Sequence, residues 1–185
     1  MGIRKIVLVL RIDCLLQVLK IAKHAIRLIY NPLLISIEMK ILVAFDNSPN
    51  AREALSYSMK FKDICEEYTI LFVNPGIMRG ATGVDTFIPE TVYTEQEDIS
   101  NHVKEGAMEI VEKMRVNINF VKKDSPGEDI AKTVVQTAVE VGADLIVSGT
   151  RRLSGISKFI LGSVSSEIIK LSTLPVLVVP LNQPA

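Results

Sequence analysis

Short apolar runs alternate with stretches of helical periodicity from Met39 onward, and this alternation is the feature that most constrains the fold. The first run, Ile41–Phe45, is continuously apolar, as expected for a strand that is buried on both faces of a sheet. The stretches between the runs are long enough for helical crossovers between parallel strands. The sequence therefore predicts an α/β fold, a doubly wound sheet of five mostly parallel strands. The predicted strands are 40–46, 68–73, 116–121, 144–148 and 175–179, and the predicted helices are about 51–64, 94–114, 126–142 and 163–171.

The predicted helix at 126–142 has recognisable ends. Ser125 is an expected N-cap, Pro126 suits the first helical position, and Glu128 lies three residues after the serine, as in a capping box. Gly142 is an expected C-terminal stop. The predicted buried stripe of this helix is Ile130, Val134, Ala138 and Val141.

The preceding helix, at about 94–114, follows a segment without a sustained period. Residues 76–93 contain three glycines and a proline and predict a long loop. The predicted buried stripe of the helix is Ile99, Val103, Ala107, Ile110 and Met114.

Composition and charge narrow the class of protein. A chain of 185 residues suits one domain with additions. Residues 1–38 carry six basic and two acidic residues, a net +4, so the remainder carries −4 and is a poor candidate for a nucleic-acid-binding surface. Cys14 and Cys65 have no local partner and no secretory signal is evident, which indicates a reduced, cytoplasmic setting.

The spacing of potential catalytic and metal-ligating residues predicts neither a metal site nor a triad. His24 and His102 are the only histidines, and neither lies three or four residues from another histidine or a cysteine. No serine, histidine and acid can be assembled for nucleophilic catalysis. We therefore nominate no catalytic and no metal-ligating residue.

Ligands of doubly wound sheets bind at the carboxyl ends of the strands, which here are Asp46, Val73 and the loop after Ser148. In that loop Gly149 would let backbone amides approach an anion, and Gly162–Ser163 opens the last helix, whose first amides and dipole favour a phosphate. Ser163 could cap this helix and donate its hydroxyl to a phosphate. Each element also has a plainer explanation, since glycine often ends a strand and Gly-Ser often precedes a helix.

Five segments together resemble the universal stress protein family. They are Ile41–Ser48, Ser125–Ile130, Ala143–Arg151, Leu161–Val164 and Leu174–Pro180. The resemblance covers Met39 to Pro180 and implies an adenine nucleotide α-hydrolase-like domain at 39–185, with strand order 3-2-1-4-5. It also implies a homodimer formed through the last strand, Pro175–Val179.

Members of this family that bind ATP have a glycine, two residues, a glycine, nine residues and then Gly-Ser or Gly-Thr. In this chain Gly149 matches the first position and Gly162–Ser163 the last pair, whereas Arg152 replaces the middle glycine. The arginine either adds a charge-assisted contact to the triphosphate or fills the pocket and prevents binding. The resemblance also places Asp46 at the adenosine end and the Val73 backbone at the adenine edge. The implied ATP-binding residues are Asp46, Val73, Gly149, Arg152, Gly162, Ser163 and Val164.

The function that the resemblance implies is a dimeric, nucleotide-responsive regulatory module of the stress response, binding ATP with or without Mg²⁺. The alternative is a structural or interaction module that has lost the nucleotide because of Arg152. An adenylating enzyme ranks last, because Asp46–Pro49 lacks the glycine-rich loop expected after the first strand. No general base is aimed at a γ-phosphate, so we expect at most slow ATP hydrolysis.

The first 38 residues lie outside the resemblance. Residues 12–30 predict an amphipathic helix with a basic polar face, interrupted by charges too often to span a bilayer. Three explanations stay open: contact with an anionic membrane surface, packing against the domain or a partner subunit, and a true start at Met39, which we favour slightly.

Overall fold

The computed structural model describes residues 39–75, 90–112, 114–125, 129–150 and 161–181. The chain divides into two units, Met1–Glu38 and Met39–Ala185, and the description below concerns the second. The predicted helix at 12–30 and Arg152 both lie outside the described residues.

The described unit is built on a five-stranded sheet in which every neighbouring pair is parallel. The order is β3-β2-β1-β4-β5, which confirms the predicted α/β class and the strand order that the resemblance implied. Because β1 lies between β2 and β4, the order reverses between β1 and β4. The strands are β1 Met39–Ala44, β2 Cys65–Asn74, β3 Ile118–Asp124, β4 Leu145–Thr150 and β5 Val176–Pro180.

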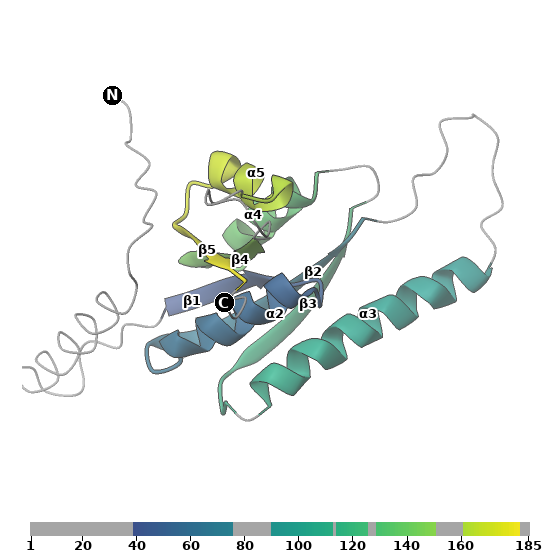
Figure 1. Ribbon diagram of the computed structural model, residues 1–185, viewed down its shortest axis with the longest axis horizontal. Coiled ribbons are helices and arrows are strands. Elements are labelled where there is room, and N and C mark those ends of the chain that lie inside the picture. The colour runs from purple at the N-terminus through teal and green to yellow at the C-terminus, as the bar shows by residue number, and fades with distance from the viewer. Residues whose placement is uncertain (1–38, 76–89, 113, 126–128, 151–160, 182–185) are drawn as a thin grey trace, which may run out of the picture. The chain divides into compact units, whose positions relative to one another are not determined.

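Helices cover both faces of this sheet: α2 and α3 lie on one face, and α4 and α5 lie on the other (Figure 1). The helices are α2 Pro49–Ser58, continued by a 3₁₀ turn at Met59–Phe61, α3 Glu90–Val111, α4 Ile130–Glu140 and α5 Ser163–Leu171. The bounds of α5 are those predicted. The predicted loop at 76–93 extends too far toward the C-terminus, because α3 already begins at Glu90. Residues 76–89 lie outside the described residues.

Alternation along the strands divides the core between the two faces. Leu42 and Leu71 pack with Val134, Ala138 and other residues of α4 and α5. The intervening strand residues face α2 and α3, as Tyr68 shows by donating its hydroxyl to the Ser58 carbonyl at 2.9 Å. A sheet buried on both faces accounts for the continuous apolar run in β1.

The predicted stripe of α3 is wrong at both ends, and its last member, Met114, lies beyond the end of the helix at Val111. Val103, Ala107 and Val111 are buried, whereas Ile99 is 54% exposed. Ile110 is only half-buried, because a spacing of four from Val103 leads to Val111 and not to Ile110. Figure 1 shows the N-terminal end of α3 extending past the sheet.

The predicted N-cap of α4 is also wrong. Asp129 caps this helix by accepting a hydrogen bond from the Ala131 amide at 2.9 Å. Ser125 instead extends the edge of the sheet: its amide donates to the Asn74 carbonyl at 2.8 Å, and its hydroxyl accepts from Thr133 at 3.0 Å. The predicted stop at Gly142 is confirmed by its left-handed backbone, with φ +65°.

Candidate functional site

A cleft of about 300 Å³ opens at the carboxyl ends of β1, β2 and β4, beside the N-terminal ends of α2, α4 and α5. It lies where the strand order reverses, the position at which doubly wound sheets bind ligands. The cleft is lined by Ala44, Phe45, Asp46, Ser48, Asn50, Ala51, Leu71, Val73, Ile130, Val134, Ser148, Gly149, Thr150, Gly162, Ser163, Val164 and Ser165.

Every described member of the predicted nucleotide site lines this cleft. The structure brings together Asp46, Val73, Gly149, Gly162, Ser163 and Val164, while Arg152 lies outside the described residues. These residues come from four separate segments of the chain.

The lining has two chemically different parts. Leu71 and Val73 of β2 form an apolar part with Ile130 and Val134 of α4. The end of β4 and the start of α5 form a polar part that carries hydroxyl groups and backbone amides. Such a cleft suits a ligand with a flat apolar end and a polar or anionic end.

The sequence predicted that Gly149 lies in a loop after the fourth strand. In the structure Gly149 lies within β4, where it pairs with Val179 of β5. A β-carbon at Gly149 would lie 2.4 Å from the carbonyl oxygen of Asn50 and 2.5 Å from its carbonyl carbon. Both atoms belong to the backbone of α2, so the first turn of α2 can rest on β4 only if residue 149 is glycine. Packing alone therefore explains this glycine.

Gly162 is in a different situation. It is the N-cap of α5, with no side chain to cap the helix, so Ser163 is the first helical residue and not the predicted cap. Its amide donates to Thr150 Oγ1 at 3.0 Å, and its carbonyl accepts from Ser165 Oγ at 3.1 Å. An added β-carbon would lie 3.5 Å from its nearest neighbour, so neither packing nor the backbone, with φ −62°, requires glycine there.

The start of α5 can therefore receive an anion. The first amides of any helix lack intrahelical acceptors, and the helix dipole places partial positive charge at this end. Ser163 and Val164 are exposed and line the cleft. The N-cap, Gly162, has no side chain that could cover these amides.

Asp46 is the one charged residue among the described residues that line the cleft. It is exposed, and its Oδ1 accepts a hydrogen bond from the Ser48 amide at 3.0 Å. Ser48 in turn caps α2 by accepting from the Ala51 amide at 3.3 Å. The residue between them, Asn47, has φ +62°, so the chain makes a tight bend at the cleft rim.

Sequence reasoning missed several residues of the cleft. Thr150 connects β4 to the start of α5 through its contact with Gly162, and its position directly after Gly149 was the available signal. Ile130 and Val134 were predicted as core residues, and no pattern in α4 marks them as cleft residues.

Cys65 is the cysteine that lies within the described residues. Burial raises the pKa of the Cys65 thiol to about 11, so it is protonated at neutral pH and a weak nucleophile. In the described part of the chain no three His, Cys, Asp or Glu residues gather as a metal site would require.

No helix within the described ranges has the length and apolarity needed to cross a membrane.

The fold and the cleft define a class: a doubly wound parallel α/β protein with a ligand site at the switch point of its sheet. Comparison with known proteins narrows this class. The profile of the universal stress protein family matches residues 39–180. The chain belongs to the universal stress protein family.

Individual relatives agree with this assignment. The chain is similar to universal stress protein YxiE of Bacillus subtilis, with 33% identity over 150 residues, which cover 76% of this chain and 97% of the relative. The solved structure of MJ0577, a universal stress protein of Methanocaldococcus jannaschii, aligns with TM-score 0.60 and 25% identity over 80% of this chain and 99% of that one. A universal stress protein of Archaeoglobus fulgidus in complex with dAMP shares the fold, with TM-score 0.55 and 22% identity over 77% of this chain and 98% of that one.

Proposed function

We propose that the cleft binds an adenine nucleotide and that the protein acts as a nucleotide-responsive module of the stress response. The observation that carries this proposal is the cleft itself, with an apolar part beside β2 and α4 and the open start of α5 at its other side. The structural relative from Archaeoglobus fulgidus in complex with dAMP supports the same ligand class.

The chemistry of the lining assigns the parts of the ligand. The base lies in the apolar part, with its edge toward the backbone of Val73, and the carboxylate of Asp46 accepts from a ribose hydroxyl. The phosphates lie at the amides of Ser163 and Val164, near the Thr150 hydroxyl. ATP, with or without Mg²⁺, is the ligand that we propose, and Arg152 is the residue whose effect on the triphosphate decides between ATP binding and its loss.

The proposed role is binding and not rapid turnover. No described residue of the cleft offers a general base aimed at a terminal phosphate, since Asp46 is assigned to the ribose. A chain that has lost the nucleotide would instead serve as an interaction module with the same fold.

Nucleotide binding is tested by the melting temperature of the full chain with and without Mg-ATP, AMP and GTP. A ligand at 100 times its Kd stabilises the folded state by about 2.7 kcal/mol, a shift of several degrees. We expect this shift with the adenine nucleotides and a smaller one with GTP. An unmoved melting temperature in the natural chain, together with a clear shift in Arg152→Gly, would assign the chain to the non-binding alternative.

We also propose a homodimer formed through β5. This strand is an edge of the sheet, pairs only with β4 among the described strands, and carries the half-buried apolar side chains of Val176, Leu177 and Val178. An apolar edge of this kind favours pairing with a second copy. The sequence-based range of Pro175–Val179 is shifted by one residue from the strand itself.

Light scattering measures the dimer directly. The full chain is expected to have the mass of two 20.4 kDa chains. Val178→Lys is expected to lower the measured mass to that of a single chain, because the lysine charge would be buried at the interface. Asn119→Lys on the opposite edge, where Asn119 is exposed, is the control and should stay dimeric. A monomeric natural chain, or a dimer lost equally in both variants, would contradict pairing through β5.

A further inference from the structure

The bend that carries Asp46 is held from outside the cleft, by α3. We propose that Asn47, Arg52 and Gly106 form a positioning device that docks this bend on α3 and so sets the place of the Asp46 carboxylate in the cleft. The inference deepens the proposed function and rests on it for the identity of the ligand.

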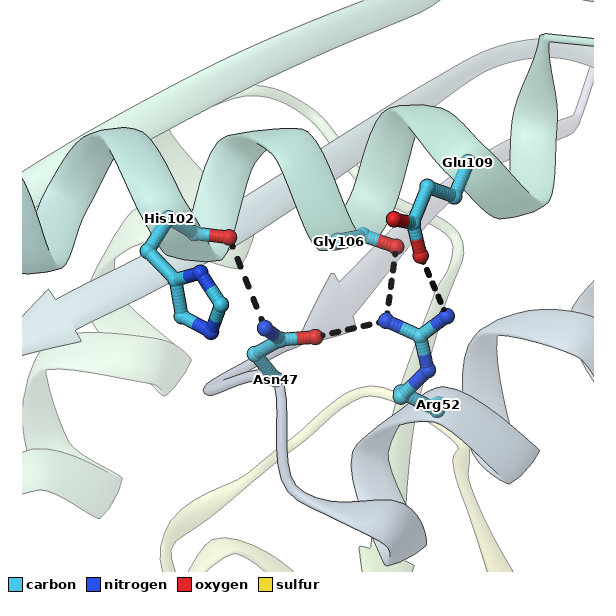
Figure 2. A network of polar contacts seen from close by, with 5 residues as sticks. All are labelled: Asn47, Arg52, His102, Gly106 and Glu109. Carbon is cyan, nitrogen blue, oxygen red and sulfur yellow. Dashed lines mark hydrogen bonds and ion pairs between the residues drawn. The ribbon is translucent and has the colours of Figure 1, made fainter.

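Figure 2 shows how the device is assembled. Asn47 lies below α3, and its Nδ2 donates to the carbonyl of His102 at 3.4 Å. Its Oδ1 accepts from Arg52 Nη1 at 2.8 Å. The same Arg52 nitrogen donates to the carbonyl of Gly106 at 3.3 Å. One amide side chain is therefore bound on both sides, by α2 and by α3.

The backbone of Asn47 needs such support. Its φ of +62° lies in the left-handed region, which is unfavourable for residues other than glycine, although asparagine tolerates it best. Asp46 and Ser48 on either side line the cleft, whereas the side chain of Asn47 contacts α3. The contacts of this one side chain thus fix the bend between two cleft residues.

Gly106 shows how closely the bend and α3 approach one another. A β-carbon at Gly106 would lie 2.1 Å from Asn47 Oδ1 and 2.5 Å from its Cγ, so any side chain at 106 displaces the asparagine. Glycine is intrinsically unfavourable in the interior of a helix such as the 22-residue α3. Its missing side chain at position 106 makes room for Asn47 to dock on the helix.

The ion pair in the same network is of lesser importance. Arg52 Nη2 lies 2.7 Å from Glu109 Oε2, but the two side chains are 38% and 66% exposed. Exposed pairs of this kind contribute little because water screens them. The positioning therefore depends on the contacts of Asn47, and Glu109→Gln should have little effect.

The test compares two ligands in variants of the full chain. In the proposed orientation Mg-ATP contacts both Asp46 and the start of α5, whereas inorganic triphosphate is long enough to occupy only the start of α5. Asn47→Gly keeps the left-handed backbone but removes the docking contacts, and Gly106→Ala displaces Asn47 from the α3 side while improving helix propensity. Asn47→Asp keeps the acceptor for Arg52 but loses the donor to the His102 carbonyl, so it is a partial variant that separates the two contacts. Glu105→Ala, on the exposed side of α3, is the control.

Calorimetry is expected to show a roughly tenfold weaker Kd for Mg-ATP in Asn47→Gly and Gly106→Ala, as expected for the loss of one well-placed hydrogen bond to a charged group. Glu105→Ala should stay within about threefold of the natural chain, and Asn47→Asp should fall between this control and Asn47→Gly. The Kd for inorganic triphosphate should change in none of the variants. In an Asp46→Ala background, Gly106→Ala should cause no further loss.

A measurement without ligand separates this inference from the proposed function. The Ser48 amide donates to Asp46 and reports the bend, so its hydrogen exchange should be roughly tenfold faster in Asn47→Gly and Gly106→Ala than in the natural chain. Unchanged exchange in both variants would overturn the positioning role, as would equal losses of Mg-ATP and triphosphate binding. Faster exchange in a chain that binds no nucleotide would leave the positioning role standing and overturn the proposed function.

Discussion

Gly149→Ala is expected to destabilise the domain by about 3 kcal/mol, because the new methyl group would collide with backbone that cannot move by itself. The added carbon would lie 2.4 Å from the Asn50 carbonyl oxygen, and relief requires a shift of α2 relative to β4. Urea unfolding of the full chain without ligand measures the loss. A lower midpoint urea concentration, with an unchanged dependence of the unfolding free energy on urea concentration, would show that stability has changed and the cooperativity of unfolding has not.

Gly162→Ala is the matched control for this variant. It makes the same chemical change in the other cleft glycine, where the nearest heavy atom would be 3.5 Å away. The loss expected at an N-cap is only about 0.5–1 kcal/mol. If the two variants unfolded at the same urea concentration, the close contact between β4 and α2 would not be the reason for glycine at 149.

This difference between two glycines could not be predicted from the sequence. Both belong to the glycine pattern of the ATP-binding members of the family, and both suggested backbone near a phosphate. The close contact of Gly149 is with Asn50, which is far away in the sequence, so no local pattern contains it. Only Gly162 has no packing reason to be glycine, which is why we propose that its small size serves the ligand.

The sheet, in contrast, was predictable because the signal for each strand is local. The continuous apolar run of β1 follows from burial on both faces, and the helical intervals between runs leave a parallel sheet as the simple solution. The errors arose where two local signals compete. Ser125 and Asp129 both suit an N-cap, but the Ser125 amide bonds to the Asn74 carbonyl just after β3 and its hydroxyl accepts from Thr133.

The cleft was predictable in part for a similar reason. The rule for strand ends located Asp46 and Val73, since it depends only on the order of strands. It did not locate the bend that α3 holds, because Asn47 and Gly106 interact through tertiary packing and carry no motif of their own.

Gly162→Asp is expected to separate ligand binding from stability. Aspartate is a better N-cap than glycine and its charge complements the helix dipole, so the free protein should be more stable by about 0.5 kcal/mol. The same charge would lie where we propose that the phosphates bind. Repulsion of about 3 kcal/mol or more at close range should weaken the Kd for Mg-ATP roughly 100-fold or more, as measured by calorimetry at low salt.

Gly162→Asn distinguishes charge from size. Asparagine has the shape of aspartate and caps a helix equally well, but it carries no charge, so its effect on the Kd should be several-fold and not 100-fold. The loss in Gly162→Asp should also shrink as salt is added, because ions screen the repulsion. If both variants lost affinity equally, the cause would be the space that the new side chain occupies, and not repulsion between its charge and an anionic ligand. If neither lost affinity, the phosphates would bind away from α5, and the orientation that we propose for the nucleotide would be wrong.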